Sequence, residues 1–493
     1  MKKFDEIVEI LRENELLVEV KETDLEIEDI NYDSRNVKDN TLFFCKGVHF
    51  DVKYLEDAIN RGAGAYISEN KYNYDIPYII VNDIRKSMYV VAGFFFDYPD
   101  RKLNLIGVTA TKGKTTTVTL IKESIDLYAK ESGEKPAGLI STTYTFDGLN
   151  EYESHLSTPE AIELHRNLYN AYNAGLKYVV LEVSSQSLKY ARVAGLDFDI
   201  AGIVTIGRDH IAPNEHPTVE DYVDSKLKLA DIAEKVVYCR DTDHLERIEN
   251  KLKKMDAISF AAEHDADYVI TNLRFEDGFT KFIFDGDDFE LNMMGTFNSV
   301  NAACALLVLK HFGIDYKYAK EVFRNIVIPG RSNLLISNDG KKTIFVDYAH
   351  NELSFTKNFE MLKEYFPDYK IVTLFSARGS KAFNRRKESA VVVSNNSDYI
   401  YLIPIEPNYE ELRDIYDSLI ENFTWDIPYE EFETRVDGLE KAFKTFGDKT
   451  ILFIAGKGDE RYQSVKGQYI EIESDLQVAT RLIKVYNETH PKE

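Results

Sequence analysis

Apolar positions along the first hundred residues alternate between helical and strand-like spacing. Four apolar residues recur at the spacing of one helix face: Phe4, Ile7, Val8 and Leu11. Three short apolar runs typical of strands follow, at residues 41–45, 65–67 and 78–81. Between them, residues 55–61 predict a helix that Gly62 ends. This alternation predicts a small α/β domain with a covered sheet over residues 1–98.

The next block, residues 99–328, contains apolar runs that are short, continuous and rich in β-branched residues. They lie at residues 103–108, 178–183 and 200–204. Such runs are typical of parallel strands buried on both faces, so we expect a doubly wound sheet of the P-loop type. The first run leads into a glycine-containing loop and a helix from Thr115 to about Lys130. Residues 262–292 alternate more strictly, which predicts an antiparallel addition.

The last block, residues 329–493, repeats the alternation of buried strand and helix. Its four apolar runs lie at residues 343–346, 371–375, 399–403 and 450–455. Helical stretches separate the runs, which predicts a second α/β unit with a Rossmann-like sheet. The predicted fold class is therefore α/β with three domains, of which the central one carries the P-loop-type sheet.

Composition narrows the classes of partner. The 493 residues carry a formal net charge of −24, and such an acidic surface repels nucleic acid and anionic membranes. No apolar run approaches the length of a membrane span, and the charged start has no apolar leader segment. Three cysteines lie far apart without metal-ligand spacing, which fits a reducing compartment: Cys45, Cys239 and Cys304. We expect a cytoplasmic monomer that binds neither nucleic acid nor membrane.

The clearest candidate for chemistry is the loop at Gly113-Lys114-Thr115. Backbone N–H groups of a loop between a buried strand and a helix point toward phosphate, and the helix dipole adds favourable potential. Lys114 would reach the β- and γ-phosphates of ATP, and Thr115 or Thr116 would hold Mg²⁺. The strict motif needs glycine at position 108, where this chain has Val108. An ordinary turn is the alternative, and the position between strand and helix favours the phosphate loop.

Around this loop, a series of segments resembles the motifs of the Mur ligase family in the right order. They are Asp33-Ser34-Arg35, residues 107–116, Ser157-Thr158-Pro159-Glu160, residues 181–185 with Arg192, Asp209-His210, residues 295–301, Pro329-Gly330-Arg331, Asp347-Tyr348-Ala349-His350 and residues 456–463. One such segment would be a weak signal, but the ordered series is a strong one. Within the family, the chain is most similar to the UDP-N-acetylmuramoyl-tripeptide synthetases, and the resemblance covers nearly the whole chain.

The resemblance implies an ATP-dependent amide ligase of peptidoglycan synthesis. A carboxylate of UDP-N-acetylmuramoyl-L-alanyl-D-glutamate would attack the γ-phosphate of ATP, and an amino acid would then displace phosphate from the acyl phosphate. Phosphoryl transfer of this kind depends on positioning and charge neutralisation more than on covalent help. The resemblance also implies that the three domains bind, in chain order, the UDP-linked substrate, ATP and the amino acid.

The resemblance further implies roles for the residues that match the family's motifs. ATP would contact Thr111, Lys112, Gly113, Lys114, Thr115, Thr116, Asn298, Asn301, Arg331, Asp347 and His350. Mg²⁺ would be held by Thr115, Glu182, His210 and a carbamate on Lys226. The muramoyl dipeptide would contact Ser34, Ser157, Thr158, Ser184 and Arg192. The catalytic set would be Lys114, Glu182, His210 and Lys226.

Lys226 has the most unusual of these implied roles. The segment that ends at Lys226 resembles the one in which the family carbamylates a lysine with CO₂. Carbamylation needs a neutral amine and therefore a partly buried site that lowers the pKa of the lysine. Position alone fits a helix-surface lysine beside Lys228, whereas the flanking motifs favour the carbamate.

The amino-acid pocket departs most from the family. The diaminopimelate-adding enzymes carry Asp-Asn-Pro-Arg, whose arginine grips a carboxylate, whereas this chain has Ile405-Glu406-Pro407-Asn408. We expect the amino acid to contact Lys381, Glu406, Asn408, Asp459 and Glu460. Three of these residues are acidic and could face a cationic side chain, which suggests L-lysine or ornithine. In the phosphate loop, Ala110 and Lys112 replace the family's glycine and asparagine without forbidding ATP.

Two alternatives stay open. A paralogue could join a different acid and amine, because several pocket positions have changed and the family's Asp-Gly-His is missing after Gly47. A nucleotide-binding regulator could have lost catalysis, although the metal-binding set would then have no use. Three histidines outside the motifs are interpreted as surface or loop residues: His155, His165 and His216.

Overall fold

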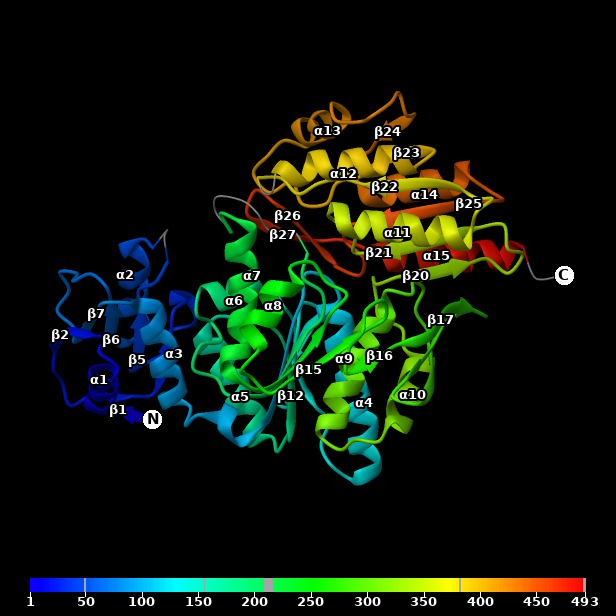
Figure 1. The fold of residues 1–493 in the computed structure, drawn as a ribbon. Coiled ribbons are helices and arrows are strands. Elements are labelled where there is room, and N and C mark those ends of the chain that lie inside the picture. Colours follow the sequence, from blue (N-terminus) through cyan, green and yellow to red (C-terminus); the bar gives the residue numbers. More distant parts are fainter. Residues whose placement is uncertain (48–49, 155, 208–215, 381–382, 491–493) are drawn as a thin grey trace. The chain divides into compact units, whose positions relative to one another are not determined.

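The computed structural model describes residues 1–47, 50–154, 156–207, 216–380 and 383–490 (Figure 1). Backbone contacts divide the chain into two compact units. The first unit contains Met1–Ile206, Glu220–Phe260 and Cys304–Ala319, and the second contains Gly207–Val219, Ala261–Ala303 and Lys320–Glu493. Each unit has its own core, and each is described separately below.

The N-terminal part of the first unit is a five-stranded sheet covered on both faces. Its strands are, in spatial order, β2 (Leu17–Lys21), β7 (Tyr78–Val81), β6 (Ala63–Ser68), β5 (Thr41–Phe44) and β4 (Asp29–Asn31). Strands β4 to β7 are parallel, and β2 is antiparallel to β7. Alternating residues of β5 enter opposite cores, because Phe44 packs with α1 (Phe4–Glu13) and α3 (Ile84–Phe95), whereas Phe43 packs with α2 (Val52–Asn60). Short strands β1 (Lys2–Lys3) and β3 (Glu26–Ile27) pair at the edge.

The central sheet of the first unit places the phosphate loop at its middle strand. Its strands run in the order β11 (Glu151–Glu153), β10 (Tyr144–Phe146), β9 (Gly138–Ile140), β12 (Tyr178–Glu182), β8 (Asn104–Thr109), β13 (Phe198–Ile203), β14 (Ala233–Cys239) and β15 (Ala257–Ala261). The strands from β9 to β15 are parallel, and β10 and β11 form an antiparallel edge. In β8, a side chain at Gly107 would begin 2.8 Å from the Phe198 ring.

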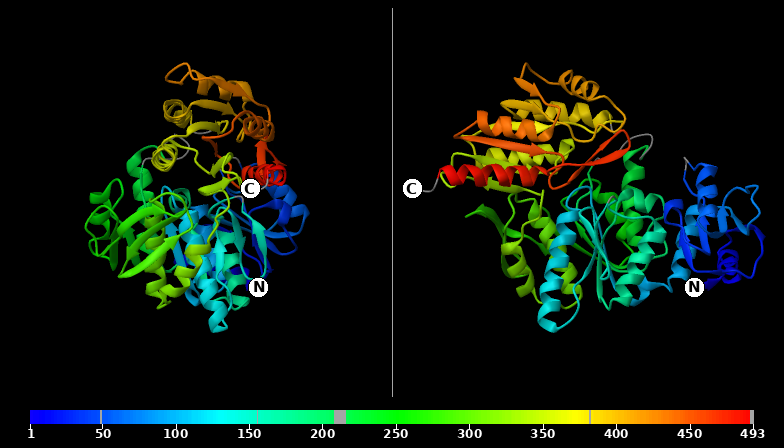
Figure 2. Two further views of the ribbon diagram at one scale, coloured as in Figure 1. Left: turned by 90° about the vertical axis from the view of Figure 1, so that its right-hand side faces the viewer. Right: turned by 180° about the vertical axis from the view of Figure 1, so that it is seen from behind.

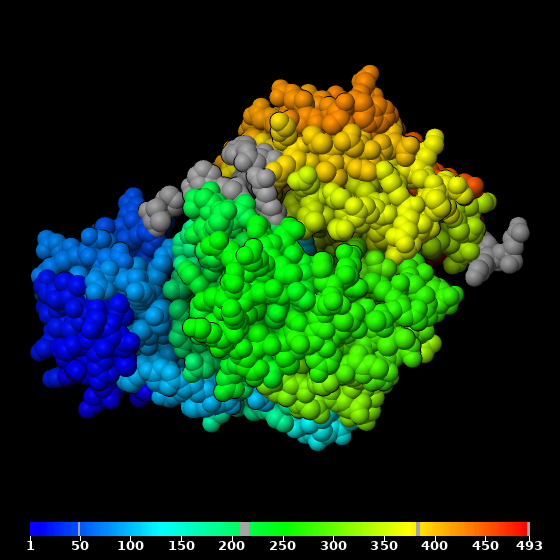
Figure 3. All heavy atoms as spheres, in the orientation of Figure 1, coloured from blue at the N-terminus to red at the C-terminus, as the bar shows by residue number. Residues whose placement is uncertain are grey.

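Helices connect these strands. They are η1 (Ser34–Asn36), η2 (Pro99–Lys102), α4 (Lys114–Ser132), α5 (Ala161–Asn173), α6 (Ser185–Lys189), α7 (Val219–Leu227), η3 (Lys228–Ile232) and α8 (Leu245–Leu252). Helix α9 (Asn298–His311) and helix α10 (Tyr316–Asn325) belong in part to each unit. Figure 3 draws the atoms of the N-terminal part of the first unit in blue.

The second unit begins with short strands that the alternating pattern predicted. Strand β16 (Tyr268–Val269) precedes an antiparallel sheet of β17 (Thr271–Glu276), β18 (Phe279–Phe284) and β19 (Asp287–Leu291). Every second residue of β18 is buried, as a strand with one covered face requires. The predicted antiparallel addition is therefore confirmed.

The C-terminal sheet of the second unit is doubly wound. Its order is β20 (Asn333–Ile336), β21 (Thr343–Asp347), β25 (Thr450–Ala455), β22 (Lys370–Phe375), β23 (Tyr399–Leu402) and β24 (Tyr429–Glu431). All neighbours are parallel except β20 and β21. One face is covered by α11 (Glu352–Tyr365), α12 (Phe383–Asn396) and α13 (Leu412–Ile420). The other is covered by α14 (Arg435–Thr445) and α15 (Asp475–Thr489), the red helix of Figure 2.

The α/β fold class and the Rossmann-like C-terminal sheet are confirmed. The apolar runs missed the edge strands, among them β2, β20 and β24, and the hairpin of β26 (Tyr462–Val465) and β27 (Gln468–Glu471). The limits 1–98, 99–328 and 329–493 stay predictions, because the first unit includes both the N-terminal and the central sheet. Within the described residues, no helix is long and apolar enough to cross a membrane.

Candidate active site

The phosphate loop lies where β8 ends and α4 begins. Strand β8 stands between β12 and β13, so the loop follows the carboxyl end of a central parallel strand. Gly113 directly precedes α4 and has φ 91°, a left-handed conformation that glycine adopts without strain. Lys114, Thr115 and Thr116 therefore form the first turn of a long helix, where the backbone N–H groups and the helix dipole favour an anion.

The side chain of Lys114 folds back over its own loop. Its Nζ donates to the carbonyl oxygen of Ala110 at 2.8 Å and to that of Thr111 at 3.4 Å. Thr111 is held in turn, because its N–H donates to Thr205 O at 2.6 Å and its hydroxyl lies 3.0 Å from the hydroxyl of Tyr222. Lys112 forms an isolated β-bridge with Thr205. These contacts fix the loop between β8 and β13.

Lys226 lies buried against the same loop. It is 1% exposed on α7, and its Nζ donates to Ala110 O at 2.8 Å and to the Thr109 hydroxyl at 3.4 Å. The ring of Tyr222 lies 4.8 Å from this Nζ. The interpretation of Lys226 as a helix-surface lysine is therefore wrong. The buried position fits the neutral amine that carbamylation requires, and the carbamate itself stays a prediction.

Glu182 ends β12, beside β8, and is fully buried. In the described part of the chain, both donors to its carboxylate belong to the neutral Thr142, whose N–H and hydroxyl lie at 3.1 Å. Among the described residues, no cationic side chain pairs with this buried carboxylate, and carboxylate and hydroxyl oxygens such as those of Glu182 and Thr142 are the hard ligands that suit Mg²⁺. These residues fit a magnesium ion. His210, predicted to hold it, lies outside the described residues.

The predicted muramoyl-binding residues surround Glu182. The hydroxyl of Thr158 donates to the backbone oxygen of Glu182 at 2.8 Å and accepts from the N–H of Ser184 at 3.1 Å. Ser157 accepts from the Thr142 hydroxyl at 2.7 Å. Ser184 caps helix α6, because its hydroxyl accepts from the N–H of Ser187 at 3.1 Å. The structure therefore brings three of the predicted residues together beside Glu182.

An ion cluster that we call the Glu160 cluster contains Glu160, Lys46, Arg85 and Arg192. Lys46 Nζ lies 2.8 Å from one carboxylate oxygen of Glu160, and Arg192 Nη2 lies 3.0 Å from the other. Arg192 also donates to Thr158 O at 3.1 Å, and Lys46 lies over the ring of Tyr32. Burial works to raise the pKa of Glu160, but the charges of Arg192, Lys46 and Arg85 outweigh it and hold this pKa below its usual range.

The Glu160 cluster carries more positive than negative charge. Lys46, Glu160 and Arg192 are only 13–16% exposed, so solvent screens them weakly. An anion could therefore bind beside them in a chain whose net charge is −24. Ser34, predicted for the same substrate, is buried at the start of η1, whereas its neighbour Arg35 pairs with Asp33 and is exposed.

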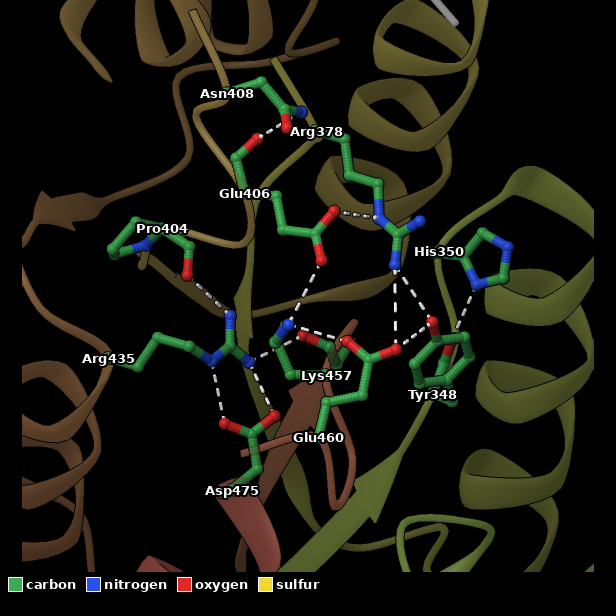
Figure 4. A network of polar contacts seen from close by, with 11 residues as sticks. Tyr348, His350, Arg378, Pro404, Glu406, Asn408, Arg435, Lys457, Glu460 and Asp475 are labelled. Carbon is green, nitrogen blue, oxygen red and sulfur yellow. Dashed lines mark hydrogen bonds and ion pairs between the residues drawn. The ribbon is translucent and has the colours of Figure 1, made fainter. Parts of the chain in front are cut away.

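In the second unit, Glu406 and Glu460, two of the residues predicted to contact the amino acid, belong to a second cluster (Figure 4), which we call the Glu406–Glu460 network. Lys457, fully buried, lies 3.3 Å from Glu406 and 2.6 Å from Glu460. Arg378 lies 3.3 Å from Glu406 and 3.8 Å from Glu460. The Tyr348 hydroxyl donates to Glu460 at 2.5 Å. Burial works to raise the pKa of Glu460, but Lys457 and Arg378 outweigh it and lower this pKa.

The network is electrically balanced, with two carboxylates and two cations. Both acidic residues therefore already have cationic partners within the protein. Asn408 donates to the backbone oxygen of Gly379 at 2.8 Å, which fixes the loop rather than leaving the amide free. Asp459 accepts from the Ser474 hydroxyl at 2.7 Å. Lys381 lies outside the described residues.

The predicted C-terminal ATP residues lie next to this network. The guanidinium of Arg331 lies 4.1 Å from the centre of the Tyr348 ring, and His350 Nδ1 lies 2.8 Å from Tyr348 O. Asp347 accepts from the N–H of Ser332 at 2.9 Å. Asn298 and Asn301 are buried at the start of α9 and joined by a hydrogen bond of 3.0 Å. The two groups of ATP residues, those of the loop and these, thus belong to different compact units.

Sequence reasoning missed several residues that hold these sites together. They are Lys46, Arg85, Thr142, Tyr222, Arg378, Arg435 and Lys457. Lys457 and Tyr222 stand inside segments that matched the family, so those motifs pointed near them. The others lie outside the matched motifs, or carry no local pattern that separates them from surface residues.

Two of the three histidines outside the family motifs are buried. His165 is buried on a helix, so its interpretation as a surface or loop residue is wrong, whereas His216 is buried in the segment between β13 and α7 and is a loop residue that does not lie at the surface. His165 lies on α5 with Nδ1 2.8 Å from Ala161 O, and burial lowers its pKa to about 4. His155 lies outside the described residues. Among the described residues, no three His, Cys, Asp or Glu side chains form a metal-binding group.

Comparison with known proteins decides the family. The Mur ligase middle domain matches residues 108–309, and the Mur ligase, glutamate ligase domain matches residues 330–458. A UDP-N-acetylmuramyl-tripeptide synthetase from Ligilactobacillus salivarius is 33% identical over 96% of this chain and 98% of the relative. This chain belongs to the Mur ligase family. A UDP-N-acetylmuramoyl-L-alanyl-D-glutamate--L-lysine ligase from Streptococcus pneumoniae is 31% identical to this Mur ligase over 97% of the chain and 99% of the relative.

Solved structures share the fold of this Mur ligase. A UDP-N-acetylmuramoyl-L-alanyl-D-glutamate--2,6-diaminopimelate ligase matches with a TM-score of 0.64 at 22% identity, covering 99% of this chain and 100% of that chain. The MurF ligase from Thermotoga maritima in complex with ADP matches with a TM-score of 0.62 at 18% identity, covering 95% and 100%. At these identities the likeness shows the fold alone. The family resemblance and the three-domain α/β fold predicted from the sequence are confirmed.

Proposed function

We propose that this Mur ligase uses ATP and Mg²⁺ to join L-lysine to UDP-N-acetylmuramoyl-L-alanyl-D-glutamate. The observation that carries the proposal is that Lys114 and Lys226 both contact Ala110 O in the loop after β8, while Glu182 ends the neighbouring strand β12. A nucleotide-binding module alone has no need for a buried carboxylate and a second buried lysine at the phosphate loop. The relatives named as tripeptide synthetase and L-lysine ligase support the same reaction.

The reaction would proceed in two steps. A carboxylate oxygen of the acid attacks the γ-phosphorus of ATP, the bond to ADP breaks, and an acyl phosphate forms. The amine nitrogen then attacks the acyl carbon, phosphate leaves, and the amine loses a proton to give the amide. Lys114 and the N-terminus of α4 hold and neutralise the phosphates, and Thr115 and Glu182 would hold Mg²⁺. The bound ion supplies charge neutralisation at the phosphates.

The acid would bind at the Glu160 cluster. Arg192 and Lys46 offer positive charge close to Ser157 and Thr158, which lie beside Glu182. A carboxylate placed there is near the metal-binding side chains, and attack on the γ-phosphate requires that proximity. The alternative of a different acid would appear as turnover without the muramoyl dipeptide.

Two observations favour L-lysine as the amino acid. The relatives in Streptococcus are named L-lysine ligases, and this chain has Asn408 where the diaminopimelate enzymes carry an arginine. Glu406 and Glu460 would accept the ε-ammonium group while Arg378 and Lys457 balance their charges. Ornithine, which has a shorter cationic side chain, is the nearest competitor.

An assay of phosphate release over a panel of amino acids tests the proposal. We expect release that requires ATP, the UDP-linked dipeptide and an amine together, with L-lysine giving the highest kcat/KM. A product whose mass equals the dipeptide substrate plus lysine minus water would identify the bond. Best turnover with diaminopimelate or a neutral amino acid would contradict the lysine assignment, and release without either acid or amine would indicate an ATPase.

The metal is tested by chelation and replacement. We expect activity to disappear with excess chelator and to return when Mg²⁺ is restored, because phosphoryl transfer needs its charge. Full activity in a metal-free buffer would contradict this role. The cytoplasmic location and the monomeric state stay predictions from the sequence.

A further inference from the structure

One buried arginine in the second unit connects backbone positions that no strand pairing connects. Arg435 is the first residue of α14 and is 4% exposed. Its Nη1 donates to Pro404 O and its Nη2 to Ala455 O, each at 3.0 Å (Figure 4). Its Nε and Nη2 also donate to the two carboxylate oxygens of Asp475, at 2.8 and 2.6 Å.

The two carbonyl groups belong to strand ends that are not neighbours. Ala455 ends β25, and Pro404 follows the end of β23. Strand β22 lies between these strands in the sheet, so no backbone hydrogen bond of the sheet joins them directly. The planar guanidinium, with its fixed donor directions, spans that gap from one side chain. Arg435 therefore sets the spacing of the two chain segments that leave the sheet there.

Each of these segments carries a charged residue of the Glu406–Glu460 network two positions farther on. Pro404 precedes Glu406 by two residues, and Ala455 precedes Lys457 by two residues. Glu406 and Lys457 lie 3.3 Å apart. A shift of either segment changes the distance between Glu406 and Lys457 directly, because each charged residue lies only two positions after the carbonyl group that Arg435 holds.

Asp475 connects Arg435 to the loop that contains Gly458 and Asp459. It is 1% exposed at the start of α15. The preceding Ser474 donates to Asp459 at 2.7 Å, and the N–H of Leu476 donates to Gly458 O at 3.2 Å. The start of α15 is therefore tied both to Arg435 and to the loop that carries Glu460. A buried ion pair of this kind is costly to desolvate and is not needed for stability alone, since apolar pairs can serve as well.

We propose that Arg435 is a positioning residue for the amino-acid pocket, acting through Pro404 O, Ala455 O and Asp475 rather than through contact with substrate. The proposal rests on the proposed function of the Glu406–Glu460 network. When these contacts of Arg435 are lost, the segments that carry Glu406 and Lys457 can move independently. Amino-acid binding weakens as a result, while the phosphate loop and the Glu160 cluster, which belong to the other unit, keep their geometry.

The substitution Arg435→Lys tests this with little loss of charge or volume. A lysine has one nitrogen on a flexible stem and cannot hold both carbonyl groups and both oxygens of Asp475. We expect the KM for the amino acid to rise about tenfold or more, because small displacements of binding groups are expensive. We expect the KM values for ATP and for the UDP-linked dipeptide to stay within about twofold. A general loss of structure would instead lower kcat and change all three KM values together.

Arg481→Lys is the matched control. Arg481 lies on α15 in the same unit and also pairs with carboxylates, those of Glu473 and Glu440, but it is 40% exposed and donates to no backbone carbonyl of the described residues. Its substitution should leave the KM for the amino acid unchanged. If Arg435→Lys does not fold, Asp475→Asn provides the same measurement, with a smaller rise of that KM expected because one charge is lost and the carbonyl contacts remain.

Amide hydrogen exchange separates failure of this proposal from failure of the proposed function. We expect Arg435→Lys to speed exchange in residues 404–408 and 456–460 of the full chain, but not in the strands β18 and β19 of the same unit. An unchanged KM for the amino acid, or equal exchange in both loops of a folded variant, overturns the positioning role. If the wild-type chain turns over no amino acid, the proposed function fails, and the exchange result alone still decides whether Arg435 holds the two loops.

Discussion

The Glu160 cluster and the Glu406–Glu460 network use the same kinds of charged side chain in different proportions. Around Glu160, one carboxylate meets Lys46, Arg192 and the more distant Arg85, so positive charge is in excess. In the second unit, two carboxylates meet two cations, and the charges balance. The first arrangement suits an anionic substrate, whereas the second suits an amino acid that carries both signs.

Burial differs as well. Lys457 is fully enclosed, whereas the partners of Glu160 keep about a seventh of their surface in solvent. When its carboxylate partners are removed, an enclosed cation stays unsolvated, whereas water can solvate a partly exposed one. We therefore expect the network to be more important for stability and the Glu160 cluster to be more important for substrate affinity. Four substitutions test this difference.

The largest expected effect follows from Lys457→Met. Removal of the buried ammonium leaves Glu406 and Glu460 close together with Arg378 as their remaining cation, and breaking a buried pair from one side typically costs about 3–5 kcal/mol. We expect the free energy of unfolding to fall by an amount of that order, measured by chemical denaturation. Lys466→Met is the control, because Lys466 pairs with Glu411 at the surface. Equal stability of the two variants would show that the enclosed network does not stabilise the unit.

Arg192→Met should act on affinity rather than on stability. Arg192 contacts both Glu160 and the backbone oxygen of Thr158. Its loss removes the charge that would hold the acid, so we expect the KM for the UDP-linked dipeptide to rise about 30-fold, a value typical of losing one partner of a close charge pair. Arg166→Met, which removes an arginine paired with Asp29 in the same unit, is the control. An unchanged KM would place the acid elsewhere.

Lys46→Met should also raise the KM for the UDP-linked dipeptide, but by a smaller factor than Arg192→Met. Lys46 lies over the Tyr32 ring and beside Glu160, and Arg192 remains when it is lost. We expect the KM for the dipeptide to rise about tenfold or less with the KM for ATP unchanged. Lys71→Met is a close control, because Lys71 also lies over a tyrosine and beside a glutamate, but at the surface. A similar effect of both substitutions would contradict a specific role for Lys46.

The smallest expected effect concerns pH. The pKa of Glu160 is below its ordinary value of 4.5, so its interactions stabilise the fold above pH 4.5 and are lost as the pH falls through the lower folded pKa. Glu160→Gln should therefore reduce the loss of unfolding free energy on acidification below pH 4.5. Glu19→Gln is the control, because Glu19 also has a lowered pKa but is exposed and screened. Parallel pH curves for wild type and Glu160→Gln would contradict the coupling.

Local sequence patterns were enough to predict the strands and the helix that position the phosphate loop. The run at residues 103–108, its glycine loop and the following helix form as predicted, because a buried parallel strand and a helix N-terminus both have local signatures. The short edge strands had no such signature, since an edge strand such as β20 is only partly buried. The acidic character of residues 406 and 460 was visible, but their pairing with Lys457 and Arg378 was not.

The sequence by itself determined the family, the α/β class and the order of the chemical motifs, because each depends on residues that are close together in the chain. Only the tertiary structure decided which charges meet. The position of Lys226 in the chain fits a helix surface and only the flanking motifs favoured a partly buried site; the structure places Lys226 against the phosphate loop, more than a hundred residues away in the chain. Arg435 reaches Pro404, Ala455 and Asp475 across three separate segments. Electrostatic energy depends on distance in space and on burial, and a linear pattern contains neither.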